Sequence, residues 1–305
     1  MKKVFFTFLK FLVSFLLLYF LFRKFPLRSV IDVVKGMELW SIWGGIFLVF
    51  VFFFISSLRW KMLLSEQEIY ISLPRTFVYF LISFFIGTFL PSGLGMDVVR
   101  SIYAGGRKNF ERAFISTLVD RTLGMSALIF IGFVFSFTHR NFLVFLPIYG
   151  GFLALIAALF LLIMKEKVGM VRRMTEKIKF LKEPLSKMYR AFLVYREKKK
   201  TLVNVFLLSL FLQLIFILYN MVLAWGMGYR AVLPFFVYIP LAGVVALLPI
   251  SIGGLGPREA TYVYLFSFAG FPSEGALALS LLSFALGLIP ALLGGFLLPF
   301  FKPSE

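Results

Sequence analysis

The sequence contains no cysteine and only one histidine among its 305 residues. Disulfides, thiolate chemistry and cysteine-based zinc sites are therefore excluded, and so are metal sites built on histidine pairs. Charge is scarce as well, because 15% of the residues are charged and 61% are hydrophobic. Soluble domains have about a quarter of their residues charged, so a soluble protein of this length could not cover its apolar surface. The composition predicts a protein that crosses a membrane several times.

Acidic residues are the scarcer part of the charge, with 14 Asp and Glu against 32 Lys and Arg and a net charge of +18. A basic balance can indicate nucleic acid, but in a membrane protein it more often reflects topology and contact with anionic lipid. The most basic segment, residues 165–200, offers only four aromatic side chains for base stacking, and Phe192 and Tyr195 among them lie on its apolar stripe. We therefore expect no nucleic-acid partner.

Apolar segments of spanning length recur along the chain and predict an all-α polytopic membrane protein with about 6–8 transmembrane helices. The first of these has no small-residue cleavage site before Arg23-Lys24-Phe25-Pro26, so we expect a retained helix rather than a signal peptide. Arg59-Trp60-Lys61 indicates that the second segment ends at the membrane interface. The expected segments are Val4 to Phe22, Leu39 to Leu58, Leu73 to Leu90, Ala113 to Phe137, Phe142 to Met164, Leu202 to Leu223, Val232 to Ile250, the short Thr261 to Phe271, and Gly275 to Phe301 with a kink at Pro290.

We expect a single transmembrane domain over residues 1–305, with a first half (1–164), a connector (165–200) and a second half (201–305). The connector carries 13 Lys and Arg against 4 Asp and Glu, which favours the cytoplasmic side. Its apolar residues recur at helical spacing, and Pro184 divides the stripe into two helices. Either an amphipathic pair lies on the anionic leaflet, or the connector is a solvated loop. Charge counting does not settle the side of the N-terminus, although the cytoplasmic side is favoured.

Two apolar segments break at similar glycine-rich sequences. Leu90-Pro91-Ser92-Gly93-Leu94-Gly95-Met96-Asp97 precedes Arg100, and Leu248-Pro249-Ile250-Ser251-Ile252-Gly253-Gly254-Leu255-Gly256-Pro257 precedes Arg258-Glu259. Paired breaks of this kind point to a transporter site at the interface of two repeats, because unwound backbone at membrane depth must be buried or line a wet cavity. We expect two re-entrant segments in a weak inverted repeat, each with a helix start that suits an anion. Ordinary kinks are the alternative.

Ionisable residues cluster beside these breaks, and inside membrane segments such residues are costly and usually functional. Asp120 and Arg121 are adjacent on one helix, so their side chains diverge and each needs another partner. We expect Asp120 to pair with Arg100 or Arg258, and Arg121 with Asp97 or Glu259. The network either clamps the helices together or presents arginines to a phosphate, which forked guanidinium donors suit.

The same motifs, in this order, resemble the flippase-like transmembrane domain of lysylphosphatidylglycerol synthases, a prokaryotic family that also has free-standing members. The resemblance covers essentially the whole chain and includes Arg59-Trp60-Lys61-Met62-Leu63-Leu64. Family members usually have Gly-Gly-Asp where this chain has Gly95-Met96-Asp97, and often Glu-Arg where it has Asp120-Arg121. The candidate substrate-binding residues are Arg59, Pro91, Gly93, Gly95, Asp97, Arg100, Asp120, Arg121, Gly253, Gly254, Gly256, Arg258 and Glu259.

The resemblance implies translocation of an anionic or phosphate-bearing lipid between leaflets of the prokaryotic cytoplasmic membrane. A polyprenyl-phosphate sugar is a second candidate substrate, and a homo-oligomer is left open. The chain has no nucleotide-binding motif and ends at Glu305 without an aminoacyl-transferase domain, so we expect neither catalytic residues nor a cofactor. Two alternatives are a membrane enzyme acting on a lipid-linked phosphate, with a divalent metal held by Asp97 and Asp120, and a scaffold that recruits partners through the connector.

Overall fold

The computed structural model describes residues 12, 15–17, 19–25, 27–90, 95–164, 193–247, 251 and 254–304, and every regular element among them is helical. Most of the first expected segment and of the connector lies outside these residues, and so do Pro91, Gly93 and Gly253. The described elements are α2 (Leu27–Lys35), α3 (Leu39–Glu66), α4 (Leu73–Phe89), α5 (Gly95–Gly105), α6 (Phe110–Phe135), the 3₁₀ helix η1 (Arg140–Phe145), α7 (Leu146–Met164), α10 (Lys199–Gly226), α11 (Leu233–Leu247), α12 (Pro257–Ser267), α13 (Ser273–Leu297) and the 3₁₀ helix η3 (Leu298–Phe300).

Five of the described helices are long and apolar enough to cross a membrane, while α4 and α11 are shorter apolar helices. The chain is therefore a multi-pass membrane protein, as the composition predicts. α13 continues through Pro290 without ending. One expected boundary is wrong, because α3 does not end before Arg59 but runs on to Glu66, with Arg59 and Trp60 buried in its last turns.

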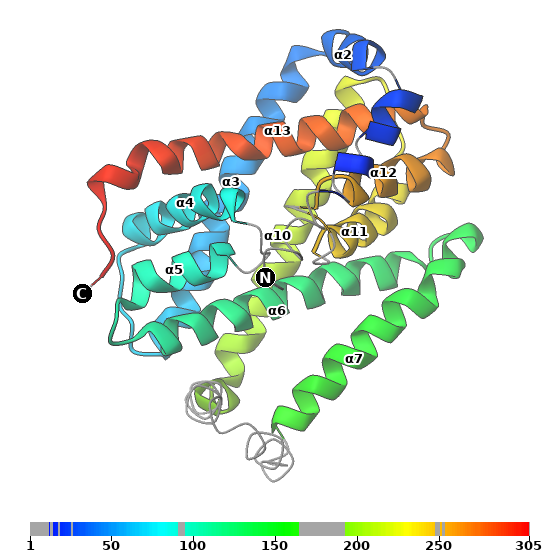
Figure 1. Cartoon of the computed structure of the whole chain (residues 1–305). Coiled ribbons are helices and arrows are strands. Elements are labelled where there is room, and N and C mark those ends of the chain that lie inside the picture. Colours follow the sequence, from blue (N-terminus) through cyan, green and yellow to red (C-terminus); the bar gives the residue numbers. More distant parts are fainter. Residues whose placement is uncertain are drawn as a thin grey trace.

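The bundle has two recognisable ends because α3 and α10 pack antiparallel (Figure 1). At one end the Glu38 backbone N–H donates to the Gly226 carbonyl over 3.0 Å. At the other, Lys198 pairs with Glu66 at 3.0 Å. We call the second the connector end, since α10 begins there, and the first the far end.

The hairpin of α4 and α5 enters and leaves at the connector end. Arg112, in the first turn of α6, pairs with Glu68, just after α3, at 2.8 Å, so the chain returns to this end after α5. The hairpin of α11 and α12 enters and leaves at the far end, where Tyr229, just after α10, lies against Phe271, just before α13, with ring centroids 4.5 Å apart. The two broken segments are re-entrant from opposite ends, as predicted.

The two halves repeat each other element by element. Helices α3, α4, α5 and α6 have 28, 17, 11 and 26 residues, and α10, α11, α12 and α13 have 28, 15, 11 and 25. The contacts repeat as well, since α13 packs on α4 as α6 packs on α11. In Figure 1 the hairpin α4–α5 lies on one side and α11–α12 on the other, both between α13 and α6. The inverted repeat is therefore carried by α3–α6 and α10–α13.

The junctions inside the halves repeat too. After α3, Glu68 takes a φ of 62°, and after α10, Gly228 takes a φ of 88°. In each case the next N–H bonds back to the helix, from Ile69 to Leu64 at 3.0 Å and from Tyr229 to Ala224 at 2.9 Å. Each short helix then starts at Leu-Pro, where proline fits because its missing N–H would have no helical partner. The turns after α3 and α10 therefore set where each hairpin begins.

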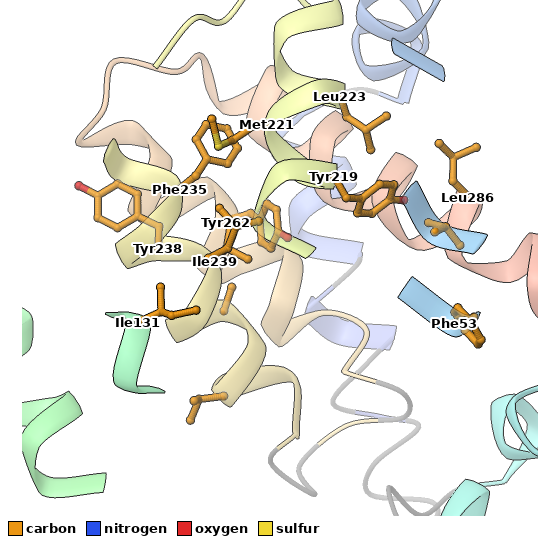
Figure 2. Packing of buried hydrophobic residues seen from close by; sticks show 14 of the residues in the cluster. Phe53, Ile131, Tyr219, Met221, Leu223, Phe235, Tyr238, Ile239, Tyr262 and Leu286 are labelled. Carbon is orange, nitrogen blue, oxygen red and sulfur yellow. The ribbon is translucent and has the colours of Figure 1, made fainter. Parts of the chain in front are cut away.

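The core contains residues of both halves, and its aliphatic side chains are interspersed with many aromatic ones. Figure 2 shows side chains of α10, α11 and α12 gathered there, among them Tyr219, Tyr238 and Tyr262. α13 approaches α4 most closely at Gly294, where an added Cβ would lie 2.1 Å from the Leu81 carbonyl oxygen. Small residues allow such backbone approach in membrane helices.

Replacing Gly294 by alanine should therefore force α13 away from α4. We expect a loss of about 1–3 kcal/mol, the usual cost of overpacking, seen as a lower apparent melting temperature of the detergent-solubilised protein. Gly287→Ala is the matched control on the same helix, because no atom lies within 4 Å of the place that its added methyl group would take. Equal shifts in both variants would contradict the close crossing.

Candidate functional site

The first break is tightly packed against the end of α4. An added Cβ on Gly95 would lie 2.6 Å from the Leu90 Cβ, and one on Gly87 would lie 2.7 Å from the Met96 Cβ. Side chains at these two positions would push α4 and α5 apart. The glycines therefore let the hairpin turn sharply, which brings Asp97, in the first turn of α5, into the protein interior.

Asp97 joins α5 to α6. Its Oδ2 is 2.5 Å from Arg121 Nη1, and its Oδ1 accepts from Arg100 Nη2 at 3.5 Å. Asp97 and Arg100 are three residues apart on α5, so they share one face of the helix. Of the expected partners for Arg121, the structure selects Asp97.

Asp120 joins three helices. Its Oδ1 accepts from Arg59 Nε of α3 at 2.7 Å, and its Oδ2 accepts from Arg100 Nη1 of α5 at 3.2 Å. Arg59 also donates to Ser209 of α10 at 3.0 Å. An added Cβ on Gly124, one turn further along α6, would lie 3.2 Å from Arg59 Nη1, so this glycine makes room for the guanidinium.

Arg100 lies against two aromatic rings. Its Cζ is 4.6 Å from the centroid of Trp60 and 4.8 Å from that of Phe80. The Trp60 indole N–H donates to Thr117 of α6 at 3.1 Å, which holds that ring in place. Desolvated cation–π contacts of this kind contribute about 2 kcal/mol. Arg100 Nε has no hydrogen-bond partner in the described structure. The positive charge of Arg100 is therefore stabilised by the two rings and by Asp97 and Asp120.

We call Arg59, Asp97, Arg100, Asp120 and Arg121 the arginine cluster. Asp120 lies about 15 Å along α6 from Phe110 at 1.5 Å per residue, well inside a bilayer core about 30 Å thick. The exposed fraction of the side chain is 22% for Arg121 but 9% for Arg59 and 2% for Arg100. Arg121 is therefore the arginine of the cluster that a ligand can reach most easily.

The second break carries a smaller pair. Arg258 pairs with its own neighbour Glu259, so of the two partners expected for Asp120 the structure selects Arg100. Its Nε also donates to Ser280 of α13 at 3.2 Å, and its Cζ lies 4.7 Å from the Phe284 ring. Asp120 and Arg121 diverge as predicted, but Arg258 and Glu259 do not, because Glu259 is at the start of α12, where both side chains can turn to one side.

Glu259 also caps its own helix. Its Oε2 accepts from the Gly256 N–H at 2.6 Å, while Gly254 and Gly256 hold φ values of 77° and 93°, which glycine adopts at little cost. The helix start that we expected to suit an anion is therefore already occupied by a carboxylate of the chain. Asp97 is likewise the third residue of α5.

The two halves place different chemistry at matching positions. Asp97 and Glu259 are both the third residue of their helices. In the second half, however, Tyr219 bonds the Ser283 carbonyl at 2.7 Å, and Tyr262 bonds Asn220 at 2.9 Å. Neutral groups thus tie α10, α12 and α13 together, whereas ion pairs tie α3, α5 and α6.

Sequence reasoning did not find several residues of these networks. Ser209 and Ser280 are single hydroxyl residues within apolar segments, and Trp60 and Phe80 look like ordinary apolar residues. A polar residue at spanning depth is a signal in principle, but serine also bonds its own helix backbone, as Ser209 does to Val205 at 2.7 Å. Only the fold distinguishes these roles.

Part of the connector is anchored near the cluster. Tyr195 is fully buried and donates to Leu63 of α3 and Ser116 of α6, each at 2.8 Å. Loss of solvent raises the pKa of this phenol, so it remains a neutral hydrogen-bond donor. The rest of the connector helix pair that we expected lies outside the described residues.

The aspartates fit a metal poorly. Both carboxylate oxygens of Asp97 and of Asp120 face arginine nitrogens. No group of three or more His, Asp or Glu side chains that could hold a metal occurs among the residues described above.

Comparison with known proteins identifies a family. The family described as lysylphosphatidylglycerol synthase TM region matches residues 7–295, nearly the whole chain. No curated protein and no solved structure matches the chain significantly.

The arginine cluster should be essential for folding. Asp120→Asn would leave Arg59 and Arg100 with one partner fewer at depth, and breaking a buried pair costs about 3–5 kcal/mol. We expect a large drop in apparent melting temperature and in the yield of monodisperse protein.

Glu68→Gln is the matched control for this loss of a carboxylate. Its pair with Arg112 is exposed, with side chains 74% and 50% accessible, and such pairs contribute about 0–1 kcal/mol. If Asp120→Asn behaved like Glu68→Gln, the cluster would not hold the helices together.

Proposed function

Because the chain belongs to the family of the lysylphosphatidylglycerol synthase TM region, we propose that it moves a phosphate-bearing lipid between the two leaflets of a membrane. The family and the membrane-spanning helices establish a multi-pass membrane protein of a lipid-related family. Leaflet exchange, and a role as a flippase or scramblase, are the proposed part.

The observation that carries the proposal is the charge of the arginine cluster. Three arginines face two aspartates there, so the cluster has one positive charge in excess. Charge at membrane depth is costly unless it is compensated. The head group of an anionic lipid supplies the missing negative charge, and a guanidinium binds phosphate through parallel hydrogen bonds.

Two arginines are placed to meet such a head group. Arg121 and Arg258 are the partly accessible arginines of the two networks, with side chains 22% and 15% exposed. Arg59 and Arg100 are buried and engaged with aspartates. We assign phosphate contact to Arg121 and Arg258, and we assign Arg59 and Arg100 to holding Asp97 and Asp120 in position.

The arrangement of the hairpins also favours transport. Broken helices that enter from opposite sides and meet near the bilayer midplane are a common basis of alternating access. Here α4–α5 enters at the connector end and α11–α12 at the far end. One charged network lies beside each break, so each hairpin has an arginine that suits a phosphate head group.

Sidedness and substrate complete the proposal. We propose that the connector end faces the cytoplasm, which the positive charge of the connector favours, and that the membrane is the cytoplasmic membrane of a prokaryote. Anionic phospholipid is the first candidate substrate, and a polyprenyl-phosphate sugar is the second. The connector, through its excess of Lys and Arg, would lie against the anionic leaflet.

Removing either accessible arginine should slow exchange. A hydrogen bond to a charged group contributes about 1.5–3 kcal/mol, so we expect Arg121→Gln and Arg258→Gln each to lower the rate about ten- to a hundredfold. The measurement is dithionite quenching of fluorescent phosphatidylglycerol in proteoliposomes, with reconstituted protein quantified.

Arg112→Gln is the matched control, because Arg112 lies on the same helix as Arg121 but makes an exposed ion pair. It should exchange lipid at the wild-type rate. If both Arg121→Gln and Arg258→Gln exchanged lipid as fast as the control, the assignment of phosphate contact would be wrong.

A further inference from the structure

A cavity of about 610 Å³ lies at the far end, away from both charged networks, between η1, α11 and α12. Its walls are mainly aromatic and aliphatic. Phe142 of η1 and Tyr238 of α11 are nearly inaccessible, with ring centroids 5.7 Å apart, and form its buried part. In Figure 2 the Tyr238 side chain points away from Tyr219 and Tyr262, although all three belong to one buried cluster.

The rim of this cavity is apolar and exposed. Val144, Tyr264 and Phe268 are 69%, 65% and 63% accessible, although their side chains are as apolar as those in the core. In water such a surface would mark an interaction site. In a membrane protein, aromatic rims at helix ends lie at the lipid interface, where the available apolar partner is the hydrocarbon chain of a lipid.

In the first half of the repeat, the position that corresponds to this cavity is covered by another segment of the protein. At the connector end, the segment after α13 lies across the open end of the α4–α5 hairpin. Tyr79 donates to the Lys302 carbonyl at 3.1 Å, and the Ser304 N–H donates to the Tyr103 carbonyl at 2.9 Å. At the far end, the segment after α6 is η1, which leaves the cavity between itself and the α11–α12 hairpin.

One wall of the cavity is polar. His139, the single histidine of the chain, and Asn141 line it. The Asn141 N–H donates to His139 Nδ1 at 3.3 Å, so the neutral imidazole carries its proton on Nε2 and is a donor there. A donor beside an apolar cavity suits the ester or phosphate oxygens of a lipid whose chain lies deeper.

We propose that this cavity is a binding site for a glycerophospholipid, with one acyl chain against Phe142 and Tyr238 and the glycerol ester region near His139 and Asn141. The site does not depend on leaflet exchange, since it lies apart from the arginine cluster. Its occupant belongs to the leaflet at the far end of the bundle.

The test is photo-crosslinking in proteoliposomes with two phosphatidylglycerol probes, one with a diazirine near the ester and one with a diazirine at the end of the acyl chain. Peptide mass spectrometry then locates the adducts. We expect the ester-proximal probe to label residues 139–141 and the chain-end probe to label Phe142 and Tyr238. Adducts spread over the exposed apolar helix faces, without enrichment at the cavity, would overturn the proposal.

Blocking variants make the test specific. Ala269→Trp fills the cavity from the end of α12, and Val144→Trp covers it from the exposed rim, where folding should be unaffected. Each should lower the cavity adducts at least fivefold. Leu207→Trp is the control, because Leu207 is 56% accessible on α10 and does not line the cavity. Unchanged adducts in both blocking variants would show that the lipid does not enter.

The two proposals fail separately. Arg121→Gln should lose leaflet exchange but keep the cavity adducts, because Arg121 does not line the cavity. Loss of the adducts in Arg121→Gln, with protein that elutes as a single species, would contradict a site independent of the cluster.

Discussion

The fold depends on the compensation of charge at membrane depth. Asp97 and Asp120 together contact three arginines from α3, α5 and α6. Water cannot stabilise these charges within the bilayer, so each guanidinium must meet a carboxylate or an aromatic face. Gly87 and Gly95 allow α5 to pack closely against α4, and α5 presents Asp97 to Arg121 of α6. Helix packing and charge pairing therefore support each other.

The two halves of the inverted repeat have the same backbone plan but different side chains. The halves share helix lengths, Leu-Pro starts and left-handed stops, yet they differ in chemistry. The first half is held by ion pairs, and the second by tyrosine, asparagine and one Arg–Glu pair. A duplicated backbone with unequal charge therefore has two different electrostatic environments. The ends of the two hairpins differ as well. The α11–α12 hairpin borders an open cavity at the far end, whereas the segment after α13 covers the α4–α5 hairpin at the connector end.

Much of the architecture follows from local patterns. Hydropathy placed the long helices within a few residues, and the Pro and Gly breaks correctly indicated two re-entrant segments, because a helix interrupted at depth has unsatisfied backbone that must be buried. The expected end of α3 was wrong because Arg59-Trp60-Lys61 has the composition of an interfacial stop. The helix continues since Asp120, on a helix distant in the sequence, compensates Arg59 inside the protein.

Composition and periodicity are enough to predict a helical, multi-pass membrane protein with charged residues beside two glycine breaks, since both can be read along the chain. Which of these charged residues pair with each other is visible only in the tertiary structure. Arg59 and Asp120 are 61 residues apart, and no local pattern distinguishes that pairing from Arg258 with Asp120. The tertiary structure also shows that η1 leaves a cavity beside α11 and α12, because this depends on how separate helices approach in space.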